Sequence, residues 1–325
     1  MVELEGVEKS FPIWERHGRV RRRRRIVRAV DGVSFRIERG TMVGYVGPNG
    51  AGKSTTIKML IGILVPSAGR VSVAGLDPVR RRIDVARRLG VVFGQRSQLW
   101  WDLPLQDSFD LLRHIYRVPF GRWRANLDAF VELLDLAPLL ATPVRQLSLG
   151  QRMRGELTAA MLHDPELLLL DEPTIGLDVV AKARVREFLA RVNRERGVTV
   201  LLATHDLGDI ERLCSRILIL DRGRVIYDGE LEELKGRYGY ERTLIVDLEE
   251  PAPPLAVPGA RVERVEGPRQ WLRFRRDDVS AAELTAAVAE RARLLDLAIE
   301  EPDVEEIVRR IYVEGMAGEA VTPAT

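Results

Sequence analysis

The sequence predicts an α/β protein with a mixed sheet as its core, an N-terminal antiparallel β region, a helical subdomain and a small C-terminal α+β domain. Short apolar runs at residues 167–170, 198–203 and 217–220 are typical of strands buried on both faces of a parallel sheet. A helical pattern over residues 182–192 separates the first two runs, as a crossover between parallel strands requires. Near the N-terminus, residues 2–7 and 33–37 alternate like strands. We expect the charged stretch at residues 15–28 to interrupt that region.

The remaining pattern predicts how the chain is divided. From about residue 100 to residue 165 apolar residues recur at i, i+3 and i+4, which predicts the helical subdomain within a first domain at residues 1–240. The proline-rich residues 249–254 predict a loop or linker. Beyond them we expect strands at 261–265, 271–274 and 294–299, and helices from Ser280 and over 304–312. These elements predict an α+β domain at residues 241–315, and residues 316–325 are expected to be disordered.

Composition excludes several classes of protein. The formal net charge is +2, so the chain carries no overall charge suited to a polyanion. Its one cysteine, Cys214, excludes an internal disulfide, fits a reducing cytoplasm, and is expected to pack in the core. No apolar run approaches the roughly 20 residues that span a bilayer, and the N-terminus lacks a signal peptide's pattern. Any work on a membrane is therefore expected to need a partner.

The glycine-rich run at residues 47–55 fits the phosphate-binding loop Gly-x-x-x-x-Gly-Lys-Ser/Thr without a departure. A strand-like segment precedes it and a helical one follows, so its backbone N–H groups would meet a phosphate at a helix N-terminus. This predicts a P-loop NTPase that binds a nucleoside triphosphate. Lys53 is expected to reach the β- and γ-phosphates, and Ser54 to bind Mg²⁺. The loop residues expected to contact ATP are Gly47, Asn49, Gly50, Ala51, Gly52, Lys53, Ser54 and Thr55.

Two carboxylates follow the apolar run at residues 167–170. Asp171 and Glu172 would lie at the carboxyl edge of a parallel sheet, where ligands of α/β proteins bind. We expect Asp171 to hold Mg²⁺, directly or through water, and Glu172 to polarise the water that attacks the γ-phosphate. The alternative is a pair of solvated acids at a strand end.

Polar residues also follow two other predicted strands. His205 comes after residues 198–203 and is in a position to contact the γ-phosphate, although a lone histidine is more often structural. Gln95 follows residues 91–93 and is expected to reach the metal or the attacking water. Each signal is weak alone, but all these strand ends are expected to meet at one edge.

The segment Leu147-Ser148-Leu149-Gly150-Gln151 resembles the Leu-Ser-Gly-Gly-Gln signature of ABC transporter ATPases. With the Q-loop glutamine, Glu172, the D-loop Gly176-Leu177-Asp178 and the H-loop histidine, the motifs stand in the order of an ABC ATPase over roughly residues 1–240. The resemblance implies the ABC-ATPase fold, ATP hydrolysis, and two copies that pair head-to-tail. The further residues that it implies at the nucleotide are Ser148, Gly150 and Gln151 from the second copy, Asp178, and Phe11 or Trp14 on adenine.

One departure from the signature affects this prediction. Leu149 stands where a glycine is usual, so the contact with the second copy's nucleotide requires its side chain to point away from the phosphate. We expect it to do so, because Ser148 and Gly150 are kept.

Residues 94–104 and 171–178 resemble the ATPase subunits of ABC-2-type transporters more closely. That resemblance implies separate membrane permeases as partners, attachment to the cytoplasmic face of the cell membrane through them, and solute transport, with export favoured. The transported substrate would be chosen by the permeases. The alternative is a soluble ABC ATPase acting on nucleic acid or ribosomes. It is opposed by the short spacing between Ser54 and Asp171, which leaves no room for a coiled coil, and by the presence of one cassette.

Two further features leave alternatives open. The arginine run at residues 21–25 is consistent with a solvated loop inside an N-terminal hairpin, with contacts to anionic lipid head groups, or with contacts to nucleic acid phosphates. Either one of Trp100 and Trp101 anchors a permease, because aromatic residues are enriched at interfaces, or both are buried in the helical subdomain.

Overall fold

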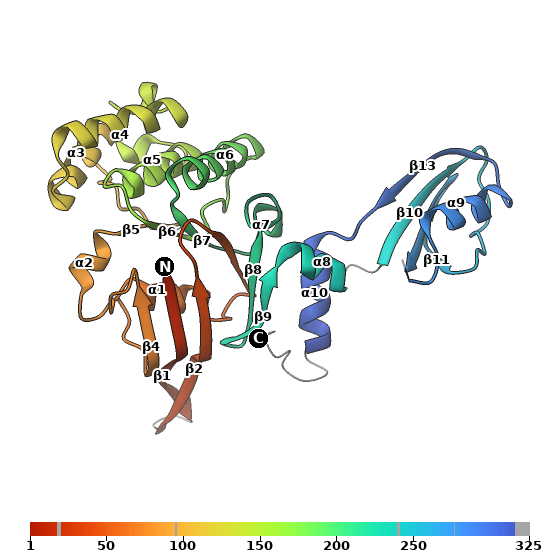
Figure 1. Cartoon of the computed structure of the whole chain (residues 1–325), viewed down its shortest axis with the longest axis horizontal. Helices are drawn as coiled ribbons and strands as arrows, with labels where there is room; N and C mark the ends of the chain where they lie inside the picture. Colours follow the sequence, from red (N-terminus) through yellow and green to blue (C-terminus); the bar gives the residue numbers. More distant parts are fainter. Residues whose placement is uncertain (18–20, 95, 239–240, 276, 316–325) are drawn as a thin grey trace. The chain divides into compact units, whose positions relative to one another are not determined.

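The computed structural model describes residues 1–17, 21–94, 96–238, 241–275 and 277–315. The chain divides into two compact units, one over Met1–Asp228 and one that begins at Gly229 (Figure 1). The sequence placed this division at residue 240. The structure places helix α8 (Leu231–Tyr238) in the second unit, where it contacts helix α10 (Val304–Gly315). The predicted tail, residues 316–325, lies outside the described residues.

The core of the first unit is a six-stranded sheet whose strands follow the spatial order β5-β6-β7-β3-β8-β9. From β5 to β8 all neighbours are parallel, so the carboxyl ends of these strands lie along one edge. The apolar runs read as buried strands are β6, β7 and β8, and nearly all of their residues are buried. The bounds are β3 Met42–Val46, β5 Leu89–Phe93, β6 Leu167–Asp171, β7 Thr199–Thr204, β8 Arg216–Asp221 and β9 Arg224–Glu230.

A second, antiparallel sheet has the order β2-β1-β4, with β1 Val2–His17, β2 Arg21–Ile37 and β4 Ala68–Val73. The expected interruption at residues 15–28 is wrong, because β1 and β2 stay paired as far as His17 and Arg21. The arginine run therefore lies on a strand and not in a loop. Residues 12–14 and 25–28 are exposed to solvent. Because neither face of this part of the ribbon is buried, charged side chains can occupy its strands.

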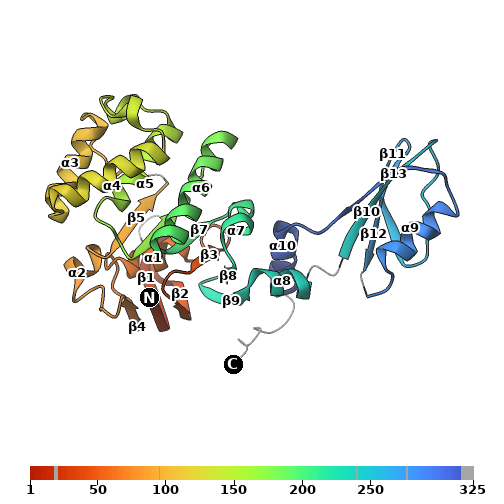
Figure 2. The same ribbon diagram turned by 45° about the horizontal axis from the view of Figure 1, so that its top comes forward.

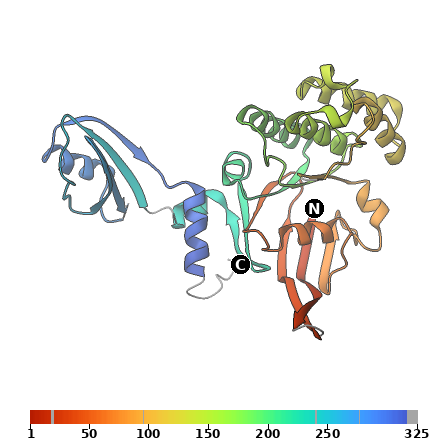
Figure 3. The ribbon, with the colours of Figure 1, turned by 180° about the vertical axis from the view of Figure 1, so that it is seen from behind.

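Helices complete the first unit. Helix α1 contacts strands of both sheets, and its side chains belong to the apolar cluster between them. Figures 1 and 3 show the antiparallel sheet and helices α3, α4 and α5 at opposite ends of this unit. The bounds are α1 Lys53–Leu60, α2 Arg82–Ala86, α3 Leu105–Tyr116, α4 Phe120–Leu133, α5 Leu149–Met161, α6 Val179–Arg196 and α7 Leu207–Leu213, with short 3-10 turns at Ala137–Leu139 and Val144–Gln146.

Cys214 follows α7 and is 5% exposed, as expected of a core thiol. Burial raises the pKa of its thiol to about 12. No described helix is long and apolar enough to cross a membrane.

The second unit is an α+β domain with a four-stranded antiparallel sheet in the order β11-β12-β10-β13. The sequence missed β10, although Leu244, Val246 and Leu248 alternate on it and are all buried against helix α9. Because β10 and β11 belong to the same sheet, the proline-rich residues 249–254 are a loop within this domain. The bounds are β10 Glu241–Leu248, β11 Ala260–Glu266, β12 Arg269–Arg275, α9 Ala281–Ala289 and β13 Leu294–Glu300.

Candidate functional site

The glycine-rich loop connects β3 to α1 and has the backbone geometry that a phosphate loop needs. Gly50 and Gly52 have φ of +85° and +110°, values that side chains other than glycine rarely permit. A Cβ on Gly52 would stand 2.5 Å from the carbonyl oxygen of Ala29, so the loop also lies too close to β2 to admit one. Gly52 is the N-cap of α1, and the first N–H groups of that helix therefore face the loop.

Lys53 extends back along the loop from the first residue of α1. Its side chain is 7% exposed, and its ammonium donates to the carbonyls of Gly47 and, at 3.3 Å, Pro48. Burial lowers the pKa of Lys53, while the charges of Glu172 and Asp171 oppose the shift. The ammonium is thus held inside the curve of the loop, next to two carboxylates.

Two oxygen ligands meet beside this lysine. The Ser54 hydroxyl acts on the carboxylate of Asp171, whose pKa is raised chiefly by burial and lowered in part by this hydroxyl. Hydroxyl and carboxylate oxygens are the donors that Mg²⁺ accepts, usually with only one or two protein ligands beside phosphate and water. The pair therefore fits Mg²⁺.

Strand register brings the predicted catalytic residues together. Phe93, Asp171 and Ala203 lie side by side on β5, β6 and β7, so the residues after them share one edge. There the Glu172 carboxylate Oε2 lies 2.7 Å from Nδ1 of His205. The same oxygen accepts from the Thr204 hydroxyl at 3.3 Å.

Glu172 has a φ of +58°, in the left-handed region that non-glycine residues rarely adopt. Its N–H donates to the carbonyl of Ala203 at 2.8 Å, which holds this conformation in place. Strained residues of this kind cluster at functional sites.

A cavity of about 620 Å³ lies at this edge and joins most of the predicted residues. Those that line it are Asn49, Gly50, Gly52, Lys53, Ser54, Thr55, Asp171, Glu172 and His205. Gly47 and Ala51 support the loop from behind, since a Cβ on Gly47 would meet Ala51 and the Leu220 carbonyl. Gln95 lies outside the described residues, but its neighbours Gly94 and Arg96 line the cavity.

Sequence reasoning missed several residues of this cavity. Lys58 lies one turn after Ser54 on α1, so helical spacing was a signal that could have found it. Arg96 directly follows the Q-loop glutamine. Ala29, Phe93 and Ile175 also line the cavity. Ala29 comes from β2, and no local motif marks it.

The signature residues lie outside this cavity. Ser148 is exposed and is the N-cap of α5, where its hydroxyl accepts from the Gln151 N–H and the Gln151 side chain accepts from the Ser148 N–H at 2.8 Å. The Leu149 side chain reaches Gly176 of its own chain, where an added Cβ would stand 2.9 Å from it. Asp178 is the exposed N-cap of α6. Gly150 likewise packs near α6, at Ala181.

The aromatic candidates for adenine stacking also lie outside the cavity. Phe11 is paired with Val27 in the β1–β2 ribbon, and the Lys9 ammonium lies 5.2 Å from its ring centre. Trp14, farther along the ribbon, is 64% exposed. Trp100 and Trp101 are 37% and 52% exposed, so neither is fully buried.

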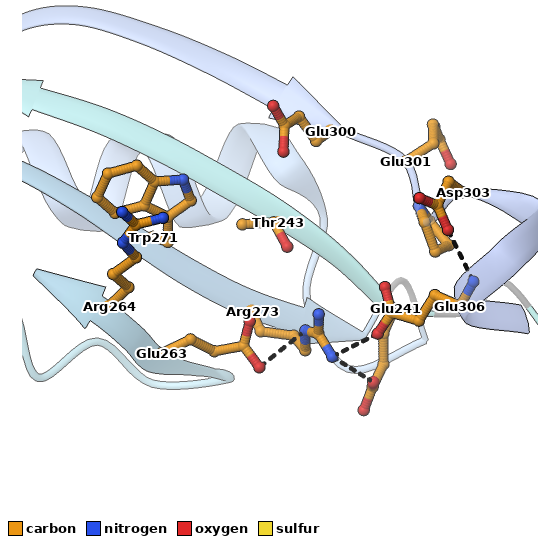
Figure 4. A pocket seen from close by; sticks show the side chains of 11 residues that line it. Glu241, Thr243, Glu263, Arg264, Trp271, Arg273, Glu300, Glu301, Asp303 and Glu306 are labelled. Atoms are coloured by element: carbon orange, nitrogen blue, oxygen red, sulfur yellow. Dashed lines mark hydrogen bonds and ion pairs between the residues drawn. The ribbon is translucent and has the colours of Figure 1, made fainter. Parts of the chain in front are cut away.

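The second unit contains a cavity of about 530 Å³ that is rich in charge (Figure 4). Arg273 lies at its centre and pairs with Glu263, Glu241 and Glu306. The Arg264 guanidinium covers the ring of Trp271 at 4.7 Å. These groups satisfy one another, so we assign no ligand to this cavity.

Comparisons with known proteins agree with this geometry. The family model described as ABC transporter matches residues 30–175. The daunorubicin resistance ATP-binding protein DrrA3 of Streptomyces coeruleorubidus is 40% identical over 219 residues, which are 67% of this chain and 69% of the relative. The ABC transporter ATP-binding protein NatA of Bacillus subtilis is 32% identical over 212 residues, 65% of this chain and 86% of the relative. A Nod factor export ATP-binding protein of Burkholderia pseudomallei is 40% identical over 205 residues, 62% of this chain and 65% of the relative.

Solved structures show the same fold. An ATP-binding subunit of an ABC transporter has a TM-score of 0.62 and 28% identity, and the match covers 73% of this chain and 93% of that one. A dimeric post-hydrolysis state of the cassette MJ0796, bound to ADP and phosphate, has a TM-score of 0.61 and 27% identity over 71% of this chain and 99% of that one. The chain therefore belongs to the ABC transporter family and is one of its ATP-binding and ATP-hydrolysing subunits.

Proposed function

We propose that this chain powers export through separate permease subunits, and that two copies close head-to-tail around ATP and Mg²⁺. One observation carries the proposal. The cavity holds the phosphate loop and the candidate base, whereas Ser148 and Gly150 lie elsewhere in the same unit, with Ser148 exposed. A site divided in this way would be completed by the signature segment of a second copy. The dimeric form of the similar cassette MJ0796 supports the same arrangement.

Within one copy, the contacts of the described residues support a role for each of them. Lys53 and the N–H groups at the start of α1 would bind the β- and γ-phosphates. Mg²⁺, held by Ser54 and Asp171, would neutralise charge that develops on the phosphates. Glu172 would orient a water for in-line attack and accept its proton. His205 fixes the Glu172 carboxylate through Oε2. Gln95 is proposed to reach the metal or the water from the neighbouring strand end.

The signature segment would act on the other copy's nucleotide. Because Leu149 packs toward Gly176 of its own chain, its bulk does not compete with the Ser148 hydroxyl for the exposed side of the helix N-terminus. We propose that Ser148 and Gly150 bind the γ-phosphate in trans, with Gln151 holding the cap and Asp178 close to the same interface. Phe11 is proposed to stack on adenine, since stacking requires only an aromatic face.

The relatives' names support a proposal about the partners and the direction of transport. DrrA3 is named for daunorubicin resistance and the Burkholderia protein for Nod factor export, which favours export here. We propose that the permeases hold the chain at the cytoplasmic face of the membrane. Exposed Trp101, which lies 5.7 Å from the Arg152 guanidinium, is a suitable aromatic anchor for that contact. No specific observation favours an action on nucleic acid.

The replacement Glu172→Gln tests the assignment of the base. It keeps the side chain's size but removes its capacity to take a proton, so we expect steady-state phosphate release to fall by a factor of about 10² or more. ATP-dependent dimerisation, followed by light scattering, should persist. Glu187→Gln, the same change at an exposed position on α6, is the control and should hydrolyse ATP normally. Full hydrolysis by Glu172→Gln would refute the assignment.

A further inference from the structure

A buried carboxylate lies between the signature helix and the segment that follows the Q-loop glutamine. Glu156 occupies the third turn of α5 and is 3% exposed. Its Oε1 accepts from the Ser97 hydroxyl, and its Oε2 accepts from the backbone N–H of Gln98 at 3.2 Å. Ser97 and Glu156 are 59 residues apart in the sequence, so this contact joins two distant parts of the chain.

The chemistry of these contacts explains why an acid is present there. Both partners can donate, and an ionised carboxylate accepts both bonds, one on each of its oxygens. Burial raises the pKa of Glu156, whereas the bonds from Ser97 and Gln98 oppose that shift. The charge of Arg152, four residues earlier on α5, also opposes the rise in the pKa of Glu156. Burying a carboxylate is costly, and the two hydrogen bonds from Ser97 and Gln98 offset part of that cost.

Gln98 adds a second connection at the same place. Its side-chain amide donates to the backbone carbonyl of Glu156 at 3.2 Å and to that of Val91 on β5 at 3.4 Å. Helix α5 also lies very close to β5, because a Cβ on Gly90 would stand 2.3 Å from the carbonyl of Ala160 (Figure 2). Residues 97–98 are thus joined to α5 and to the strand that leads into Gln95.

We infer that Glu156 is a positioning residue that makes residues 97–98 and α5 move as one body. The inference rests on the proposed function, in which Gln95 engages the nucleotide site of its own copy and Ser148 serves the other copy. Engagement of Gln95 would displace residues 97–98, and Glu156 would pass that displacement to α5 and its N-cap Ser148. Occupation of one site would thereby set the position of the signature offered to the second copy.

Variants of the full-length chain distinguish a positioning role of Glu156 from a mere contribution to the stability of the fold. Glu156→Gln replaces one acceptor oxygen with a donor at constant size, and Ser97→Ala removes the opposing donor from an exposed position. Thr158→Val is the matched control. Thr158 is buried on the same helix, and its hydroxyl donates to the carbonyl of Arg154, also within α5.

We expect Glu156→Gln and Ser97→Ala each to lower kcat by about tenfold or more with KM for ATP changed by less than about threefold, because the contact acts on the closed state and not on nucleotide binding. The double variant should lose less than the product of the two single losses, since both changes break the Ser97–Glu156 hydrogen bond. Thr158→Val should keep the wild-type kcat.

Hydrogen exchange provides the second readout. In wild type, ATP should slow exchange at residues 96–99 and at 147–151, whereas in the Glu156→Gln variant only the first segment should respond. Any of three results would overturn the inference. The first is an equal kcat in Glu156→Gln and Thr158→Val, and the second is additive losses in the double variant. The third is ATP protection of both segments in the Glu156→Gln variant. If Glu156→Gln fails to fold, Ser97→Ala alone decides by the same measurements. Absence of ATP hydrolysis in the wild-type chain would instead refute the proposed function.

Discussion

Lys53 and Asp171 face each other in the ATP site, and burial shifts each toward its neutral form. Burial lowers the pKa of the lysine and raises that of the aspartate, while the opposite charge of each neighbour counteracts the shift. Withdrawal from water also strengthens the attraction between these groups and an incoming phosphate or cation. Burial of Lys53 and Asp171 therefore strengthens their electrostatic interaction with a bound nucleotide and metal ion.

His163 is the residue whose burial predicts a measurable dependence of stability on pH. It stacks on Tyr116 at 3.9 Å between ring centres, its Nε2 lies 3.0 Å from the carbonyl of Leu89, and its buried Nδ1 has no partner in the described part of the chain. Burial lowers its pKa to about 4.

Because the unfolded chain binds this proton near pH 6.5 and the folded one only near pH 4, stability is lost as pH falls between these values. We expect this histidine to contribute a loss of about 2 kcal/mol between pH 7 and pH 5. Urea unfolding at both pH values measures it. His163→Phe, which keeps the aromatic stacking on Tyr116, should lose less stability over that range. Equal losses in wild type and His163→Phe would contradict the assignment.

At the level of elements, the N-terminus of α5 serves two purposes at once. Ser148 and Gln151 form a capping box that begins the helix, and Ser148 is also the proposed contact to the second copy's nucleotide. A change at Ser148 therefore alters both stability and activity, and the two effects must be measured separately.

Helix α9 supplies the control for this separation, because Ser280 and Glu283 form the same capping box in the second unit. Ser148→Ala and Ser280→Ala should each cost about 1 kcal/mol where measured by unfolding. Only Ser148→Ala should lower ATP hydrolysis, by about tenfold or more if a phosphate contact is lost. Full hydrolysis by Ser148→Ala would remove its role in trans.

The elements also show which parts of the fold and of the candidate site the sequence could predict and which it could not. Parallel strands end at one edge, so the convergence of the P-loop, Asp171, Glu172 and His205 followed from recognising the strands. Ala29 could not be predicted to line the cavity, because its position there depends on how β2 packs against the phosphate loop. The continuation of the β1–β2 pairing into residues 15–28 was missed because backbone pairing, and not side-chain pattern, carries it through the arginines. The Ser97–Glu156 contact follows no local spacing, so only the fold reveals it.

At the scale of the whole molecule, each of the two units has an apolar cluster of its own. The apolar cluster around β1, β3 and α1 lies entirely in the first unit, and the cluster between β10, β12 and α9 lies entirely in the second. The ATP cavity is lined only by residues of the first unit. The first unit should therefore fold and bind ATP without the second.

A chain that ends at Glu230, and so keeps β9 entire, tests this expectation. We expect it to unfold cooperatively and to bind ATP within about threefold of the full chain's affinity, as measured by titration calorimetry, because no lining residue is removed. Loss of nucleotide binding by a truncated chain that still unfolds cooperatively would show that the second unit shapes the site.

The single thiol of this molecule also has a practical consequence. Cys214 is buried, and its pKa of about 12 leaves almost no thiolate at neutral pH. It should therefore not react with maleimide reagents while the protein is folded. A cysteine introduced at any exposed position would then be the sole reactive group, with the native residue left in place. Dyes or spin labels could thus report distances in real time during turnover, on a protein otherwise identical to the natural chain.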